Sequence, residues 1–156
     1  MFLEDYLDLK TMQIDFELPA VGLRPLEGDA ASLVAKLVNL PHARAYLVKD
    51  LPARFHIGEN PRTPPVWIVP ELGWHVGRRG LYNIAAVHTM AGDHGFDNAF
   101  PDMHGILIAQ GPAFKTGGDR IAPVENVDIY NLMCAVEELK PAPNDGDDRL
   151  VKAFLK

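Results

Sequence analysis

The sequence predicts an α/β fold, with an α+β arrangement as the alternative. Short segments with strand-like patterns alternate with helix-like ones along the chain, which is typical of these two fold classes. The chain has 156 residues, which suits one domain of ordinary size. Apolar residues make up 47% and charged residues 23%, which is the balance of a globular protein rather than a disordered one.

The first third of the chain is expected to contain several short strands. Polar and apolar residues alternate over residues 5–9, as they do in a half-buried strand. Further short strands are predicted over residues 13–17, 20–23 and 45–48.

One helix is expected among these strands. Asp29 follows a glycine and has the side chain of a good N-cap. Pro41 ends the pattern, and the apolar residues between them fall at helical spacing: Leu33, Val34, Leu37, Val38 and Leu40.

Two continuous apolar runs, at residues 66–69 and 105–109, predict buried strands. Residues 50–65 and 81–101 have no sustained period and are expected to be loops.

The C-terminal part predicts two helices. Asn126 is a good N-cap for the first of them, and Pro141 ends it. A short final helix is expected over residues 149–154. Cys134 lies in the apolar pattern of the first helix, so a buried thiol is expected.

Charge and composition exclude several classes of function. The net charge is −6 and acidic and basic residues are interspersed, so the chain lacks the clustered basic surface of a nucleic-acid binder. A phosphate-bearing substrate is not excluded, because bound metal ions can supply positive charge locally. The single cysteine excludes an internal disulfide and a zinc cluster of thiolates. No apolar run reaches the length of about 20 residues that spans a bilayer, and no secretory signal is expected at the start of the chain.

The strongest candidate for a metal-binding segment is Gly92-Asp-His-Gly-Phe-Asp-Asn98. Imidazole is the commonest protein ligand of zinc, and carboxylates also bind it. Glycines on both sides of a ligand allow the backbone to turn sharply. His88 and His104 flank this loop, but their spacing matches no metal motif. The alternative is that Asp93, Asp97 and Asn98 are turn residues that bind local backbone amides.

Several segments together resemble one protein family, the nucleotide pyrophosphatases/phosphodiesterases of the alkaline phosphatase superfamily. The similar segments keep the family's order and spacing over nearly the whole chain. They are Phe2-Leu-Glu-Asp-Tyr-Leu7, Leu51-Pro-Ala-Arg-Phe-His56, Gly73-Trp74, the run from Gly92 to Asn98, Met103-His104, Ala109-Gln-Gly-Pro-Ala-Phe-Lys115, Glu125-Asn-Val-Asp-Ile-Tyr-Asn-Leu-Met-Cys134 and Leu139-Lys-Pro-Ala-Pro-Asn144.

The resemblance implies a zinc-dependent hydrolase of phosphodiester or pyrophosphate bonds. The family uses two zinc ions, held by Asp and His residues, and a Thr or Ser nucleophile that forms a covalent intermediate. By motif position, His94 corresponds to the third protein ligand of the zinc that activates water. The nucleophile and the other ligands lie upstream in the family pattern, so we expect no catalytic residue in this chain and no tight zinc binding by the chain alone. Asp93, Asp97 and Asn98 become candidates for hydrogen-bonding partners that would orient the His94 ring.

The resemblance also sets expectations for the fold. It implies a C-terminal segment with a partial alkaline-phosphatase-like fold, short strands and about two to four helices, whose main sheet a missing upstream segment completes. Residues 1–156 are expected to form one domain. Within it, residues 1–65 would be a small strand-and-helix subdomain, and residues 66–156 would belong to the catalytic sheet with the metal-ligand loop.

Partners and location follow from the same resemblance. We expect a small nucleotide or phosphodiester substrate, no nucleic-acid duplex, no membrane span, and a parent enzyme in the periplasm or outside the cell. Buried-strand candidates without partners would leave an exposed apolar edge, which a homodimer would cover. The alternative function is a catalytically inactive fragment or an association module.

Overall fold

The computed structural model describes residues 1–58, 60–80, 92–118 and 120–156. The chain forms two compact units, Met1–His104 and Gly105–Lys156. The expected subdomains, residues 1–65 and 66–156 of one domain, remain predictions.

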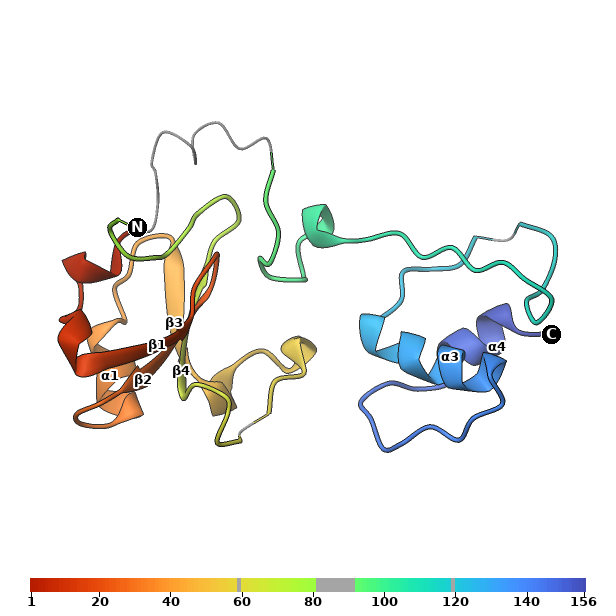
Figure 1. The fold of residues 1–156 in the computed structure, drawn as a ribbon. Helices are drawn as coiled ribbons and strands as arrows, with labels where there is room; N and C mark the ends of the chain where they lie inside the picture. The colour runs from red at the N-terminus through yellow and green to blue at the C-terminus, as the bar shows by residue number, and fades with distance from the viewer. Residues whose placement is uncertain (59, 81–91, 119) are drawn as a thin grey trace. The chain divides into compact units, whose positions relative to one another are not determined.

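The first unit is built on a four-stranded antiparallel sheet with the strand order β1-β2-β4-β3 (Figure 1). The strands are β1 (Met12–Phe16), β2 (Val21–Pro25), β3 (Ala43–Leu47) and β4 (Val66–Pro70). All four were predicted from the sequence. However, β4 lies inside this sheet, and Ile68 pairs with Val21 on one side and with Ala45 on the other. Both of its edges are hydrogen-bonded, so β4 has no free edge for a further strand.

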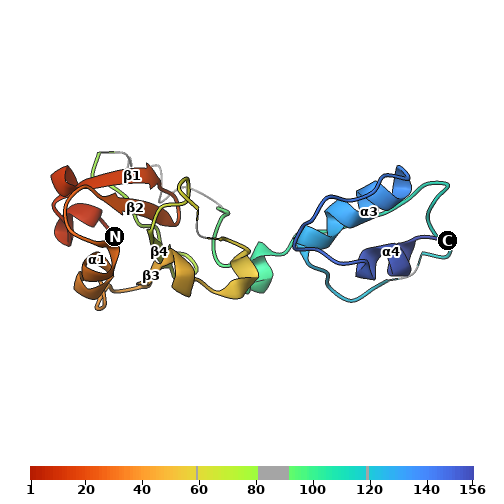
Figure 2. The same cartoon turned by 90° about the horizontal axis from the view of Figure 1, so that it is seen from below.

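The helix α1 (Ala30–Lys36) covers one face of the sheet and closes the core (Figure 2). As predicted, Asp29 caps it, because its carboxylate accepts a hydrogen bond from the Ser32 backbone N–H at 2.9 Å. The apolar stripe of α1 meets the inward side chains of β2 and β4. The buried core of this unit consists of Leu3, Leu7, Val21, Leu23, Leu33, Leu37, Val66, Ile68 and Val76.

The predicted strand over residues 5–9 is wrong. Two 3-10 helices, η1 (Leu3–Asp5) and η2 (Leu9–Thr11), occupy this region. The Leu3 backbone N–H donates to the Gly77 carbonyl at 2.9 Å, and the Leu7 N–H donates back to Leu3 at 2.9 Å. Leu3 and Leu7 are thus buried by a turn of the backbone, and their alternation with polar residues does not reflect an extended strand.

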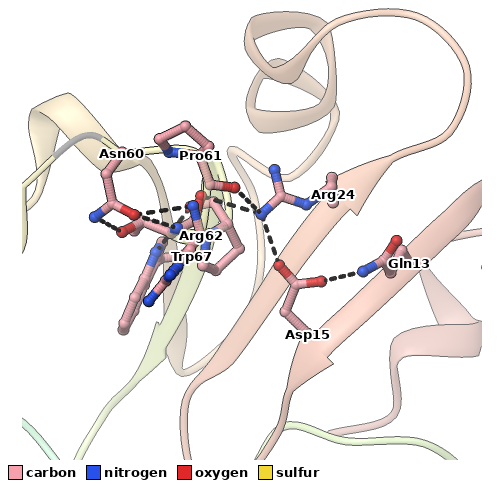
Figure 3. A network of polar contacts seen from close by, with 9 residues as sticks. Gln13, Asp15, Arg24, Asn60, Pro61, Arg62 and Trp67 are labelled. Atoms are coloured by element: carbon pink, nitrogen blue, oxygen red, sulfur yellow. Dashed lines mark hydrogen bonds and ion pairs between the residues drawn. The ribbon is translucent and has the colours of Figure 1, made fainter.

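Polar contacts hold part of the loop before β4 (Figure 3). The Arg24 guanidinium of β2 donates to the Asp15 carboxylate at 2.9 Å and to the Thr63 carbonyl at 3.2 Å. The Asn60 side-chain oxygen accepts from the backbone N–H groups of Arg62 and Thr63 at 2.9 and 3.2 Å. These contacts fix the backbone conformation of a segment in which the sequence shows no periodicity.

On the face of the sheet away from α1, aromatic rings cover a glycine. The Phe16 and Trp67 rings lie edge to face, with centroids 4.6 Å apart, and Phe16 pairs across the ladder with Gly22. A Cβ atom on Gly22 would lie 2.3 Å from Phe16 Cε1 and 2.6 Å from Pro64 Cγ. Gly22 is therefore required because the Phe16 ring and the Pro64 ring leave no space for a side chain.

The second unit contains α3 (Ile129–Val136) and α4 (Arg149–Phe154), which pack on each other. The prediction for α4 is confirmed, and Cys134 is buried as expected. Asn126 is not the N-cap of α3, because it begins a separate 3-10 turn, η6 (Asn126–Asp128), that leads into the helix. No helix in the described part of the chain is long and apolar enough to cross a membrane.

Residues 105–109 do not form the predicted strand. Ile106 and Ile108 are 91% and 83% exposed. A strand needs neighbours for its backbone hydrogen bonds, and the residues that the structure describes provide none for this segment. Its apolar side chains consequently face solvent.

A buried carboxylate organises the second unit. Asp128 is only 1% exposed; it accepts a hydrogen bond from the Asp147 backbone N–H at 2.9 Å and pairs with Arg149 Nε at 3.1 Å. Arg149 also donates to both oxygens of the Asp147 carboxylate, at 2.9 and 2.8 Å. Hydrogen bonds from Arg149 lower the pKa of Asp147 from 3.8 to about 2.

Replacing Gly22 with alanine should destabilise the chain by about 1–3 kcal/mol, because the new methyl group would overpack the Phe16 ring. The measurement is urea unfolding followed by tryptophan fluorescence. Gly58→Ala is the matched control, since no atom lies within 4 Å of a Cβ at that position. Equal unfolding midpoints for the two variants would contradict the packing described.

Arg149→Gln should raise the pKa of Asp147 from about 2 toward 3.8, because the side-chain hydrogen bonds to the carboxylate are lost. The native pKa lies below the ordinary value, so this carboxylate stabilises the folded unit above pH 3.8 and the contribution fades as the pH falls toward about 2. Carboxyl carbon NMR shifts measured against pH report the pKa directly. Lys152→Gln is the control and should produce a smaller rise; an unchanged pKa in Arg149→Gln would refute the assignment.

Candidate functional site

His94 lies on the exposed loop of residues 92–98 in the first unit. Its backbone N–H donates to the Asp93 carboxylate at 2.8 Å. Its imidazole makes no hydrogen bond or ion pair with any residue that the structure describes. Both ring nitrogens are therefore accessible to a ligand from outside the described chain.

Asp93 pairs with His75. One Asp93 carboxylate oxygen lies 2.6 Å from His75 Nε2, and both side chains are largely covered. The Phe96 ring packs against His75 with centroids 5.8 Å apart. The His75–Asp93 pair thus anchors the N-terminal end of the loop to the segment that follows β4.

Asp97 and Asn98 anchor the other end of the loop to Arg54, which lies in the 3-10 helix η4 (Ala53–Phe55). Arg54 Nε donates to Asp97 at 2.9 Å, and its Nη2 pairs with the second carboxylate oxygen. The Asn98 amide donates to the Arg54 carbonyl at 3.1 Å. The hydrogen bond from Arg54 lowers the pKa of Asp97, and the same contact raises the pKa of Arg54.

The residue after His94 makes the tight turn between these anchors. Gly95 has φ +87°, a left-handed conformation that disfavours side chains. A Cβ atom here would also lie 2.9 Å from Pro19 Cδ. The backbone beside His94 is therefore pressed against the turn between β1 and β2.

A hollow of about 250 Å³ lies beside this loop, on the face of the sheet away from α1. This volume is below the roughly 300–1,000 Å³ of typical small-molecule pockets, so we do not assign a substrate to it. It is lined by Ala20, Phe55, Ile57, Trp67, Val69, Gly95, Phe96, Asp97 and Asn98.

The described residues do not assemble a complete metal site. They contain no group of three or more His, Cys, Asp or Glu side chains that could hold a metal ion. A catalytic zinc site needs about three protein ligands, and Asp93 and Asp97 are already committed to His75 and Arg54. His94 remains a suitable single ligand, because its imidazole is exposed and unpaired. His88 lies outside the described residues.

Two neighbouring arginines of the first unit are paired with carboxylates. Arg78 Nη2 and Nε both donate to Glu17 Oε1, at 2.6 and 3.1 Å. Arg79 pairs with Asp5 and lies over the Phe2 ring, 4.4 Å from its centroid. These contacts indicate that both arginines support the structure of the first unit.

Comparison with known proteins identifies relatives in sequence. The family model for type I phosphodiesterase/nucleotide pyrophosphatase matches residues 1–97, which include His94. A venom phosphodiesterase of Naja atra is 37% identical over 131 residues, covering 82% of this chain and 15% of the relative. Human bis(5'-adenosyl)-triphosphatase ENPP4 is 41% identical over 121 residues, covering 77% of this chain and 25% of the relative.

Solved structures of the same group share the fold. Human ectonucleotide pyrophosphatase/phosphodiesterase 5 matches all of this chain with a TM-score of 0.83 and 29% identity, and the match covers 40% of that protein. An inactive variant of the murine protein, in complex with AMP, matches with a TM-score of 0.78 and 26% identity over the same shares. The chain spans less than half the length of each of these four relatives. It has the expected partial alkaline-phosphatase-like fold. The chain belongs to the type I phosphodiesterase/nucleotide pyrophosphatase family and corresponds to one segment of its longer members.

Proposed function

We propose that this chain is part of a zinc-dependent phosphodiesterase/nucleotide pyrophosphatase, in which His94 binds one of two zinc ions. The remaining ligands and the Thr or Ser nucleophile would lie in the rest of the intact enzyme, meaning the natural protein that contains these residues together with the upstream segment its relatives have. The observation that carries the proposal is the exposed, unpaired imidazole of His94, on a loop anchored at both ends.

Bound zinc would lower the pKa of a coordinated water molecule and polarise the phosphoryl oxygen. The contribution of this chain is to present His94 as a neutral imidazole at a fixed position. In the proposed reaction, the hydroxyl oxygen of the nucleophile attacks phosphorus and displaces the first alcohol or phosphate. Water then cleaves the resulting ester and frees the nucleophile.

Asp93, Asp97 and Asn98 would act on His94 through the loop backbone. Their polar atoms contact His75 and Arg54. These contacts support a role in fixing the loop rather than in hydrogen bonding to the ring of the metal ligand.

A nucleotide is the substrate class that we propose. One relative is named as a bis(5'-adenosyl)-triphosphatase, and a structural neighbour was solved with AMP. The net charge of −6 makes a nucleic-acid duplex an unsuitable partner. Relatives named as venom and ectonucleotide enzymes support a parent enzyme that works outside the cell or in the periplasm.

The second candidate is a catalytically inactive fragment or an association module. Two observations favour it for the chain by itself: the described residues contain no three-ligand metal cluster, and Ile106 and Ile108 are exposed. A homodimer that covers these apolar side chains would fit this candidate.

His94→Ala in the intact enzyme should abolish zinc-dependent hydrolysis of a p-nitrophenyl nucleotide diester. We expect a loss of more than about 100-fold, since even residues that only support a metal ligand cost about 10- to 100-fold. Bound zinc, measured by atomic emission, should fall in the same variant. The 156-residue chain alone should neither retain zinc nor turn over substrate.

His104→Ala is the matched control, because His104 is also an exposed histidine of the first unit, at the end of a 3-10 turn. It should keep both zinc and activity. If His94→Ala keeps them too, His94 is not a ligand. Zinc-dependent turnover by the chain alone would contradict the placement of the other ligands outside it.

A further inference from the structure

Arg54 connects the loop of His94 to a distant part of the chain. Arg54 and Asp97 are 43 residues apart in the sequence, and the guanidinium meets both oxygens of the carboxylate. A planar guanidinium that donates two parallel hydrogen bonds fixes the direction of its partner as well as its distance. A single ammonium group would leave Asp97 free to rotate.

Two further hydrogen bonds fix the backbone around this pair. The Asn98 amide donates to the Arg54 carbonyl at 3.1 Å. The Ala99 backbone N–H donates to the same Asp97 oxygen that accepts from Arg54 Nε, at 2.9 Å. Three consecutive residues at the end of the loop are therefore held by Arg54 or by its carboxylate partner.

This geometry has a consequence for His94. Only Gly95 and Phe96 separate it from Asp97, and Gly95 is pressed against Pro19. Metal ligands must be held close to their productive geometry, and side chains on loops reach that precision only when other contacts lock the loop. Arg54 provides these contacts at the C-terminal end, as His75 does at the N-terminal end.

We propose that Arg54 is a positioning residue, which holds the loop so that His94 retains zinc in the intact enzyme. The inference rests on the proposed function, because it takes His94 as a zinc ligand. Arg54 itself touches neither the metal nor the substrate; it acts through Asp97 and Asn98.

The first unit contains another ion pair, Arg78–Glu17, that serves as a matched control for the Arg54–Asp97 pair. In this pair, Arg78 Nε and Nη2 both donate to Glu17 Oε1, at 3.1 and 2.6 Å. Each of the two arginine side chains, Arg54 and Arg78, is 44% exposed. The carboxylates are similarly covered, at 17% exposed for Asp97 and 9% for Glu17. Exposed arginine–carboxylate pairs add little to global stability. Arg54→Gln and Arg78→Gln should therefore lower the melting temperature of the intact enzyme by similar small amounts.

Zinc retention should separate the two variants. The intact enzyme is loaded with zinc, and transfer of the metal to a chromogenic chelator is followed with time. We expect Arg54→Gln to release zinc about tenfold faster or more, in line with the cost of losing residues that support a metal ligand. Arg78→Gln should stay within about twofold of the wild type, since Glu17 forms no hydrogen bond or ion pair with the described residues of the loop. Arg54→Lys should fall between them, because lysine keeps the charge but not the planar fork.

A cobalt-substituted sample gives a second readout that does not depend on turnover. The visible absorption of protein-bound cobalt reports ligand geometry, so its bands should shift in Arg54→Gln and stay in place in Arg78→Gln. A double variant, Arg54→Gln with Asp97→Asn, should release zinc no faster than Arg54→Gln alone, because residues that act together have non-additive effects.

The outcomes distinguish the two proposals. A wild-type intact enzyme that binds no zinc would refute the proposed function. A wild-type enzyme that binds zinc, with Arg54→Gln releasing it no faster than Arg78→Gln, would overturn the role of Arg54 and leave the proposed function standing. If Arg54→Gln does not fold, Asn98→Ala removes one loop contact and keeps the ion pair. Faster zinc release in Asn98→Ala supports the proposal, and an unchanged rate overturns it.

Discussion

The pairing of β4 with strands on both of its sides is the constraint on which the first unit depends. Its hydrogen bonds to β2 and β3 bury Val66 and Ile68 against α1 and set the positions of the segments at both of its ends. The segment before β4 contains Arg54, and the segment after it contains His75. Both groups that hold the loop of His94 are thus attached to the ends of one central strand and its neighbours.

Charge pairing on this unit engages several of its arginines in contacts within the protein. Among the described residues, Arg54, Arg78 and Arg79 each face a carboxylate. Arg24 is likewise shared between Asp15 and backbone carbonyl oxygens. The net charge is −6, and the positive charges of these four arginines are offset by the carboxylates that they contact. In the proposed enzyme, the positive charge at the substrate would come from zinc, with His94 as one of its ligands.

Local patterns in the sequence predict the elements that depend on local interactions. The four strands of the sheet, α1 with its Asp29 cap, and α4 were all predicted, because alternation, capping side chains and apolar stripes are visible in short windows. Residues 5–9 were misread because Leu3 and Leu7 are buried by a turn that depends on contact with Gly77. Residues 105–109 carry the pattern of a buried strand, but a strand forms only where a partner is present. The loop of His94 was recognised from its motif, whereas Arg54 and His75 were not assigned to it, because a long-range contact leaves no periodic signal. The one available hint was the family-like segment from Leu51 to His56, which contains Arg54.

X-ray diffraction at the zinc absorption edge, from crystals of the zinc-loaded intact enzyme, tests the central claim most directly. We expect an anomalous peak about 2.0–2.1 Å from a ring nitrogen of His94, with Asp97 and Asn98 still bound to Arg54. An anomalous peak held entirely by other residues, with the His94 ring directed away from it, would contradict the account.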